Sequence, residues 1–236
     1  MKSGLSNSTL KIIALFTMLA DHIGAIFVFN NTLTIKNLPI IVASIGILLR
    51  VVGRIAFTLY SFLLVEGYLH THNKIKYFIR LLVLAIIAEC PFDLFFNNQY
   101  IDMSHQNTVF TLVIGFIAIT LIEKFSTLKN NKYLLQISCV GFLAVLAELL
   151  SFDYGFFGVI FICCLYFFKD NNRLRFTISS IPLLFCGLGQ IIGAFGFIFI
   201  SKYNNSKGSN SKYLFYVFYP LHLIILYIIK VNFIQL

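Results

Sequence analysis

The chain has 236 residues, of which 59% are hydrophobic and only 11% are charged, and its mean hydropathy is +0.88. Soluble domains carry about 25% charged residues, so this composition excludes a soluble protein and predicts one all-α membrane domain over residues 1–236. The formal net charge of +9 does not indicate nucleic-acid binding, because the lysines and arginines are spread through short loops. At about 20 residues per crossing, the chain has room for a polytopic bundle of roughly eight to ten transmembrane helices.

Apolar segments follow one another along the chain, separated by clusters of Lys, Asn and Gly. Backbone groups in lipid must be hydrogen-bonded within the protein, so these segments are predicted to be helices. The second segment is too long for one straight crossing and contains Arg50, Gly53 and Arg54, where we expect a break. The five cysteines lie within apolar segments without metal-ligand spacing, so neither disulfides nor a metal site are predicted. The segments are 10–29, 38–69, 75–96, 108–124, 132–150, 155–168, 174–200 and 213–230.

The positively charged loops predict the orientation of the helices, because loops rich in Lys and Arg stay in the cytoplasm. The loops at 70–76, 124–132 and 169–175 carry such residues, whereas 97–107 and 151–154 carry neither Lys nor Arg. This pattern predicts a multi-pass protein of the cytoplasmic membrane with an even number of crossings and both termini in the cytoplasm.

One loop disagrees with this orientation. The stretch "SKYNNSKGSNSK" at 201–212 falls outside by the count of crossings, yet it holds Lys202, Lys207 and Lys212. Either the segment 174–200 crosses twice through short halves, or this loop is an exception to the rule. The sequence leaves both possibilities open.

Several ionisable side chains lie inside the predicted spans, where each costs about 2.5–3.5 kcal/mol to insert. Such residues are functional candidates by default. The alternative is a structural ion-pair network, in which Glu66 and Glu89 balance Arg54 and Arg80; the histidines fit it less well. The candidates are Asp21, His22, Arg54, Glu66, Arg80, Glu89, Glu148 and His222.

Helical periodicity relates the candidates in the first span. Neighbours such as Asp21 and His22 point about 100° apart, so each must find its partner elsewhere. Lys11, Met18 and His22 fall on one stripe, which runs about 16 Å from the cytoplasmic end to just past the middle of the bilayer.

The last span, "KYLFYVFYPLHLIILYIIK", places Lys212, Tyr216, Tyr219 and His222 around one side of the helix. An aromatic belt at the membrane interface explains a tyrosine near the start, such as Tyr216. His222 lies too deep for such a belt. Near the outer surface, we interpret Asp93 and Asp153 as helix caps or as residues of solvated turns.

The ordered motifs resemble the TraX family of membrane proteins, named for the conjugative factor that acetylates the pilin N-terminus. They are "LKIIALFTMLADHIG", "RIAFTLYSFLLVEGYLHTHNKIKYFIRLL", "ECPFDL", "NTVFTLVIG", "DYGFFGV" and "KYLFYVFYPLHLIIL", and they cover about residues 8–230. This family in turn resembles polytopic acyltransferases, which use a cytoplasmic acyl-CoA donor and an intramembrane histidine from an early span. His22 matches that position. Two histidines, His70 and His72, stand where family members commonly show one polar residue, and no role is assigned to them.

The resemblance implies an acetyltransferase in which His22 is the general base and acetyl-CoA is the donor substrate. Asp21 or another carboxylate would orient a ring or the helix. Arg54 and Arg80 are candidates to bind the phosphates of coenzyme A, and the stripe from Lys11 to His22 would line the path of its pantetheine arm. Direct transfer and an acetyl-histidine intermediate both remain open.

Other functions compete with this hypothesis. Buried acids, histidines and arginines also make proton-coupled transporters, although no matching halves are visible in the sequence. A purely structural partner of another membrane protein would leave the buried histidines unexplained. Within the acetyltransferase hypothesis the acceptor is a pilin-like peptide amine, a sugar hydroxyl of an envelope polymer or a small metabolite. The expected partners are this acceptor and membrane lipids, with no nucleic acid.

Overall fold

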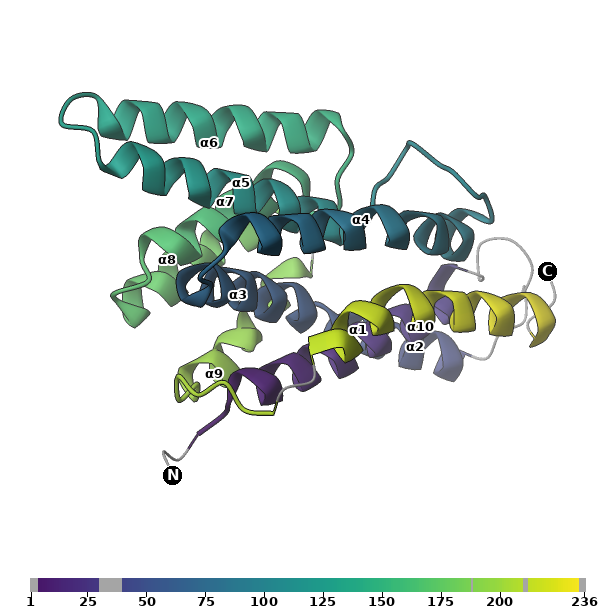
Figure 1. Cartoon of the computed structure of the whole chain (residues 1–236). Coiled ribbons are helices and arrows are strands. Elements are labelled where there is room, and N and C mark those ends of the chain that lie inside the picture. Colours follow the sequence, from purple (N-terminus) through teal and green to yellow (C-terminus); the bar gives the residue numbers. More distant parts are fainter. Residues whose placement is uncertain (1–3, 30–39, 188, 210–211, 234–236) are drawn as a thin grey trace.

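The computed structural model describes residues 4–29, 40–187, 189–209 and 212–233, and within this part of the chain it consists of helices without strands (Figure 1). Four helices are long and apolar enough to cross a membrane: Asn7–Val28, Ile40–His70, Thr108–Ser126 and Lys132–Leu149. The all-α polytopic bundle predicted from composition is therefore confirmed. The elements are α1 (Asn7–Phe29), α2 (Ile40–Gly53), α3 (Ile55–His70), α4 (Lys74–Asn97), α5 (Thr108–Ser126), α6 (Lys132–Leu149), α7 (Gly155–Phe167), α8 (Asn172–Phe185), the 3-10 helix η2 (Gln190–Phe195), α9 (Gly196–Ser201) and α10 (Lys212–Phe233).

Asparagine side chains start three of these helices. The side chains of Asn73, Asn107 and Asn171 accept hydrogen bonds from backbone N–H groups in the first turns of α4, α5 and α8. Each satisfies donors that have no partner within the helix. The Asn and Lys clusters that separated the apolar segments in the sequence therefore mark true helix starts.

One end of the bundle gathers the basic loops, and we call it the positive end. The loops that follow α3, α5, α7 and α9 all lie there. Lys74 at the start of α4 forms an ion pair with Glu123 near the end of α5. Leu5, just before α1, donates its N–H to the carbonyl oxygen of Lys202 at 2.7 Å and accepts from the N–H of Asn204 at 3.0 Å. The chain start and the loop 202–209 are thus on the same side.

The opposite end, which we call the acidic end, holds the loops 98–107 and 150–154. Gln106 and Phe152 pair through a short backbone bridge that ties these two loops together. Phe157 at the start of α7 stacks on Phe185 at the end of α8, with ring centroids 5.1 Å apart. The turn after α8 therefore also lies at the acidic end.

The segment 174–200 crosses the bundle twice through short halves. α8 runs from the positive end to the acidic end, and η2 and α9 return to the positive end. The loop containing Lys202 and Lys207 therefore joins the other basic loops, and the apparent exception to the orientation rule disappears.

This double passage bears on the prediction that both termini lie on one side. α10 starts at the positive end, and near its far end Lys230 donates from Nζ to the carbonyl oxygen of Phe95 at 3.0 Å. Phe95 belongs to the last turns of α4, at the acidic end. The described start and end of the chain thus lie at opposite ends of the bundle (Figure 1), because the segment 174–200 passes along the bundle twice, as α8 and then as η2 and α9.

The predicted break in the second segment is confirmed at Arg54, between α2 and α3. The backbone of Arg54 stays in the right-handed helical region, and its N–H bonds to Val51 three residues earlier. The interruption is a local tightening between two helices that continue one another.

α2 packs against α1 at a pair of glycines: a Cβ on Gly24 would lie 2.6 Å from the carbonyl oxygen of Gly46. Small residues allow such close approach of helices in lipid.

Candidate functional site

Two histidines meet inside the bundle. His22 on α1 is 7% exposed and His222 on α10 is 4% exposed. The Nδ1 atom of His22 lies 2.7 Å from Nε2 of His222, and the rings stack with centroids 4.9 Å apart. Phe95 and Phe96 of α4 present their rings to His22 edge-on, at 5.8 and 5.9 Å. Three helices thus enclose an imidazole pair in an aromatic pocket.

The hydrogen bonds define which nitrogen of each neutral ring carries the proton. Nδ1 of His222 lies 2.8 Å from the carbonyl oxygen of Phe218, one turn earlier in α10. A carbonyl oxygen only accepts, so this Nδ1 carries a hydrogen and Nε2 of His222 has a free lone pair. His22 must then donate from Nδ1 to that lone pair. Its own Nε2 is left as an acceptor, because the hydrogen bond of the described residues to the His22 ring uses Nδ1.

Asp21, the neighbour of His22, faces a different helix. Its carboxylate lies 2.5 Å from a guanidinium nitrogen of Arg50 and 3.1 Å from one of Arg54. All three side chains are largely buried. The expectation that Asp21 and His22 would find separate partners is confirmed, and Asp21 holds α1 to the junction of α2 and α3 instead of orienting the His22 ring.

The alternative network, in which Glu66 and Glu89 balance Arg54 and Arg80, is not formed by the described residues. Glu66 lies 3.5 Å from Arg175 at the positive end. Glu89 accepts hydrogen bonds from the backbone and side chain of Asn107.

Two buried arginines are not among the candidates from the sequence. Arg175 stands close to Lys169 and Arg173, a pattern typical of a loop, although its side chain is buried in α8. Arg50 belongs to the stretch where the sequence predicts a helix break. The spacing of four residues between Arg50 and Arg54 was the signal that both lie on one helix face.

A further polar group lies beside the histidines, toward the acidic end. Tyr219, one turn before His222, is 7% exposed. Its hydroxyl approaches Thr108 but has no partner with hydrogen-bond geometry in the described chain. Thr108 donates its hydroxyl to Asp153, whose other carboxylate oxygen lies 3.7 Å from the exposed ring of His105. This group therefore connects the buried histidine pair with the surface of the acidic end.

The two remaining basic candidates lie near the positive end. Lys11 is half-buried in the second turn of α1, and Arg80 is exposed in the second turn of α4. The guanidinium of Arg80 lies 5.9 Å from the ring of Tyr77 and interacts with Tyr216. Arg54 does not join them, because it is paired with Asp21 deeper in the bundle. A single phosphate site made of Arg54 and Arg80 is therefore not formed.

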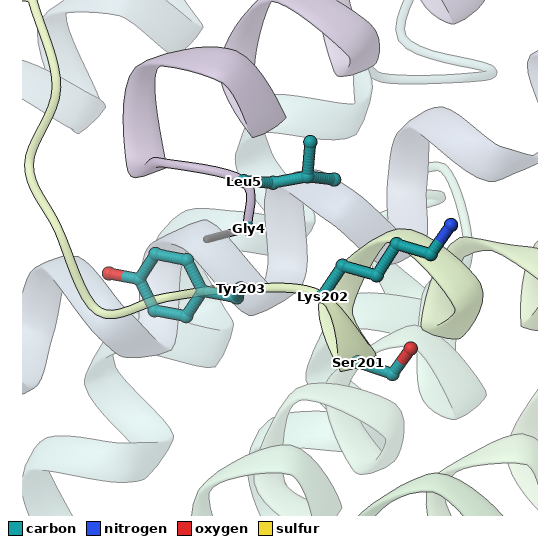
Figure 2. Close-up of a pocket in the computed structure, with 5 residues that line it drawn as sticks. All are labelled: Gly4, Leu5, Ser201, Lys202 and Tyr203. Atoms are coloured by element: carbon teal, nitrogen blue, oxygen red, sulfur yellow. The ribbon is translucent and has the colours of Figure 1, made fainter. Parts of the chain in front are cut away.

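A shallow depression of about 350 Å³ opens at the positive end, where the chain start crosses the loop after α9 (Figure 2). Its lining consists of Gly4, Leu5, Ser201, Lys202 and Tyr203. His22 stands about 22 Å further along α1. The depression is thus separate from the histidine pair, and its lining contains none of the ionisable candidates from the predicted spans. The described residues also contain no group of three His, Cys, Asp or Glu side chains able to bind a metal.

Comparisons with known proteins agree with the motifs. The chain is 26% identical to the probable fimbrial assembly protein FimC, serogroup H1, of Dichelobacter nodosus, over 92% of each chain. No solved structure matches it. The model of the TraX protein family matches residues 6–230. The chain therefore belongs to the TraX family.

Proposed function

We propose that this protein is an integral membrane acetyltransferase that moves an acetyl group from acetyl-CoA to an amine or hydroxyl acceptor. The observation that carries the proposal is the hydrogen-bonded pair of His22 and His222, which leaves Nε2 of His22 as a buried base. The similarity to the probable fimbrial assembly protein of D. nodosus supports a pilin-like peptide or another envelope component as the acceptor.

The reaction needs a base at the acceptor. As the acceptor nitrogen or oxygen attacks the thioester carbonyl, Nε2 of His22 takes its proton. The bond from carbonyl carbon to acceptor forms and the bond from carbonyl carbon to sulfur breaks. The imidazolium then returns the proton to the departing thiolate, so the products are acetylated acceptor and free coenzyme A. A neutral imidazole is well matched to both proton transfers near neutral pH.

His222 acts as a positioning residue in this scheme. By accepting from Nδ1 of His22 it selects the tautomer with a free Nε2, and by donating to Phe218 it fixes its own ring. The rings of Phe95 and Phe96 pack edge-on against His22 and give it an apolar environment, which strengthens the electrostatic interactions of the reacting groups.

The donor is proposed to enter from the positive end. Lys11 and Arg80 lie there and are suited to the phosphates of coenzyme A. The stripe on α1 from Lys11 to His22 then leads to the base, with Met18 buried along the way. Arg54 is assigned a structural role in this scheme, because Asp21 already engages its guanidinium.

The test is acetyl-CoA binding and slow hydrolysis by the purified protein in detergent. His22→Ala should bind acetyl-CoA normally and lose hydrolysis. His72→Ala is the matched control, because His72 is exposed in the loop between α3 and α4, and it should behave as wild type. If His22→Ala still hydrolysed acetyl-CoA, His22 would not be the general base. A folded wild-type protein that neither binds nor hydrolyses acetyl-CoA would overturn the acetyltransferase and favour a proton-coupled transporter.

A further inference from the structure

The proposed reaction creates a negative charge that the base itself does not stabilise. As the acceptor attacks the thioester, the π electrons of the carbonyl group move onto its oxygen, which becomes an oxyanion. Nε2 of His22 takes the proton of the acceptor in the same step, so it does not donate to this oxygen. Enzymes usually stabilise such an oxyanion with preorganised hydrogen-bond donors. A buried donor near the pair that has no other partner would serve this purpose.

Several donors around the pair are already engaged within the protein. Arg50 and Arg54, whose charges reach the histidine pair, both form ion pairs with Asp21. Thr108 donates its hydroxyl to a carboxylate of the acidic end. Lys230, near the far end of α10, donates to a carbonyl oxygen in the last turns of α4. These groups therefore have structural roles in the bundle.

The hydroxyl of Tyr219 differs from these donors. Tyr219 is 7% exposed, and its oxygen has no partner with hydrogen-bond geometry in the described chain. It approaches Thr108, whose own hydrogen is already donated to Asp153. Buried hydroxyls normally have partners, and a tyrosine hydroxyl can donate as well as accept. Tyr219 therefore retains an O–H donor for a bound molecule.

Tyr219 also stands where the acyl donor is proposed to pass. In α10 it comes three residues after Tyr216 and three before His222. Tyr216 interacts with Arg80, which is proposed to bind the phosphates of coenzyme A. The ring of Tyr219 lies 5.8 Å from that of His222, and the ring of His222 lies 4.9 Å from that of His22. Along α10, Tyr219 thus lies between the proposed phosphate site and the histidine pair.

We propose that Tyr219 is a further catalytic residue, whose hydroxyl donates a hydrogen bond to the thioester carbonyl oxygen and stabilises the oxyanion. This inference rests on the proposed function. The attacking atom and the carbonyl group would connect Nε2 of His22 to the hydroxyl through two hydrogen bonds of about 2.8 Å and two covalent bonds, a span of up to about 8 Å. The succession of the rings of His22, His222 and Tyr219 is compatible with this span.

The tyrosine keeps its own proton throughout the reaction. When the bond from the acceptor to the carbonyl carbon forms, negative charge gathers on the oxygen and the hydrogen bond from Tyr219 strengthens. When the bond from carbon to sulfur breaks, the C=O double bond forms again and the thiolate takes the proton held by His22. Because the hydrogen bond is strongest in the transition state, it raises kcat and leaves KM unchanged.

The test compares Tyr219→Phe with wild type in acetyl-CoA hydrolysis by the full-length protein in detergent. Loss of one oxyanion donor typically lowers kcat by about 100- to 1,000-fold, and we expect a loss of this size at unchanged KM. The unfolding temperature should not change, because the hydroxyl has no partner to lose. Tyr227→Phe is the matched control, because it removes a hydroxyl from the same helix about 140° away from His222. It should hydrolyse acetyl-CoA as wild type does.

A dithioester analogue of acetyl-CoA, with sulfur in place of the carbonyl oxygen, tests the contact itself. Sulfur is a weak hydrogen-bond acceptor, so Tyr219→Phe should lower kcat much less for this analogue than for acetyl-CoA. Equal losses with both substrates, a higher KM at unchanged kcat, or a kcat equal to that of wild type would overturn the inference. Hydrolysis lost in His22→Ala but intact in Tyr219→Phe contradicts only the role of Tyr219, whereas absence of hydrolysis in the wild type contradicts the acetyltransferase itself.

Discussion

Replacing His222 by Phe tests whether the hydrogen bond between the two histidines determines the base. The substitution keeps an aromatic ring of similar size between α1 and α10 but removes the acceptor for Nδ1 of His22. That N–H is then buried without a partner, which costs about 1–3 kcal/mol. His22 avoids this cost by moving its proton to Nε2, and the base is lost in that tautomer.

The size of the effect follows from the same cost. A preference of about 1–3 kcal/mol for the wrong tautomer reduces the fraction of active base by roughly 5- to 150-fold, since about 1.36 kcal/mol corresponds to a factor of ten. We expect kcat for acetyl transfer to fall by this factor while KM for acetyl-CoA stays unchanged. His222→Gln provides a side-chain oxygen as acceptor and should restore most of kcat.

The assay is steady-state acetyl transfer by each variant in detergent, with thermal unfolding to confirm equal folding. A kcat for His222→Phe within twofold of wild type would refute the reasoning. So would equal losses in His222→Gln and His222→Phe at unchanged stability, because an acceptor oxygen would then make no difference.

Three further predictions concern the fold. Gly24→Ala should destabilise the protein by about 1–3 kcal/mol, because its Cβ would lie 2.6 Å from the Gly46 carbonyl oxygen. Gly141→Ala is the control and should not destabilise the protein, because its Cβ meets nothing within 4 Å. Equal unfolding temperatures of the two variants in detergent would contradict the close helix contact. Asp21→Asn should lower the free energy of unfolding by about 3–5 kcal/mol, because it leaves two buried guanidiniums without a carboxylate. Adding Arg50→Met should recover part of this stability. A double variant no more stable than Asp21→Asn would show that the excess positive charge is not the cause. Single cysteines at residues 6 and 232 of a cysteine-free variant should react with a membrane-impermeant maleimide from opposite sides of the membrane, because the described start and end of the chain lie at opposite ends of the bundle. Labelling of both from one side would contradict this arrangement.

The histidine pair illustrates how far the sequence leads. His22 and His222 were each recognisable as polar residues at a depth where insertion is costly. Their hydrogen bond was not predictable, because 200 residues separate them and helix periodicity says nothing about which helices become neighbours. The same limit applies to Asp21: the rule for adjacent residues excluded His22 as its partner, but only the packing of α1 on α2 identified Arg50 and Arg54.

The number of crossings was undetermined for a different reason. Two short helical halves in succession have the same length and hydropathy as one long span, so composition cannot separate them. The charge of the loop 201–212 was the useful signal, since it disagreed with a single crossing. α8, η2 and α9 resolve the conflict, and the position of the chain end changes as a consequence.

The most direct test of the central claim is a single-turnover measurement with the full-length protein in proteoliposomes. Radiolabelled acetyl-CoA is mixed with an alanine pentapeptide amide that has a free α-amino group, and acetylated peptide is counted over time for wild type and His22→Ala. We predict transfer by the wild type and a loss of at least 100-fold in His22→Ala, the lower range expected for removal of a general base. Acetylated peptide formed at equal rates by both proteins would contradict the role of His22 as the base.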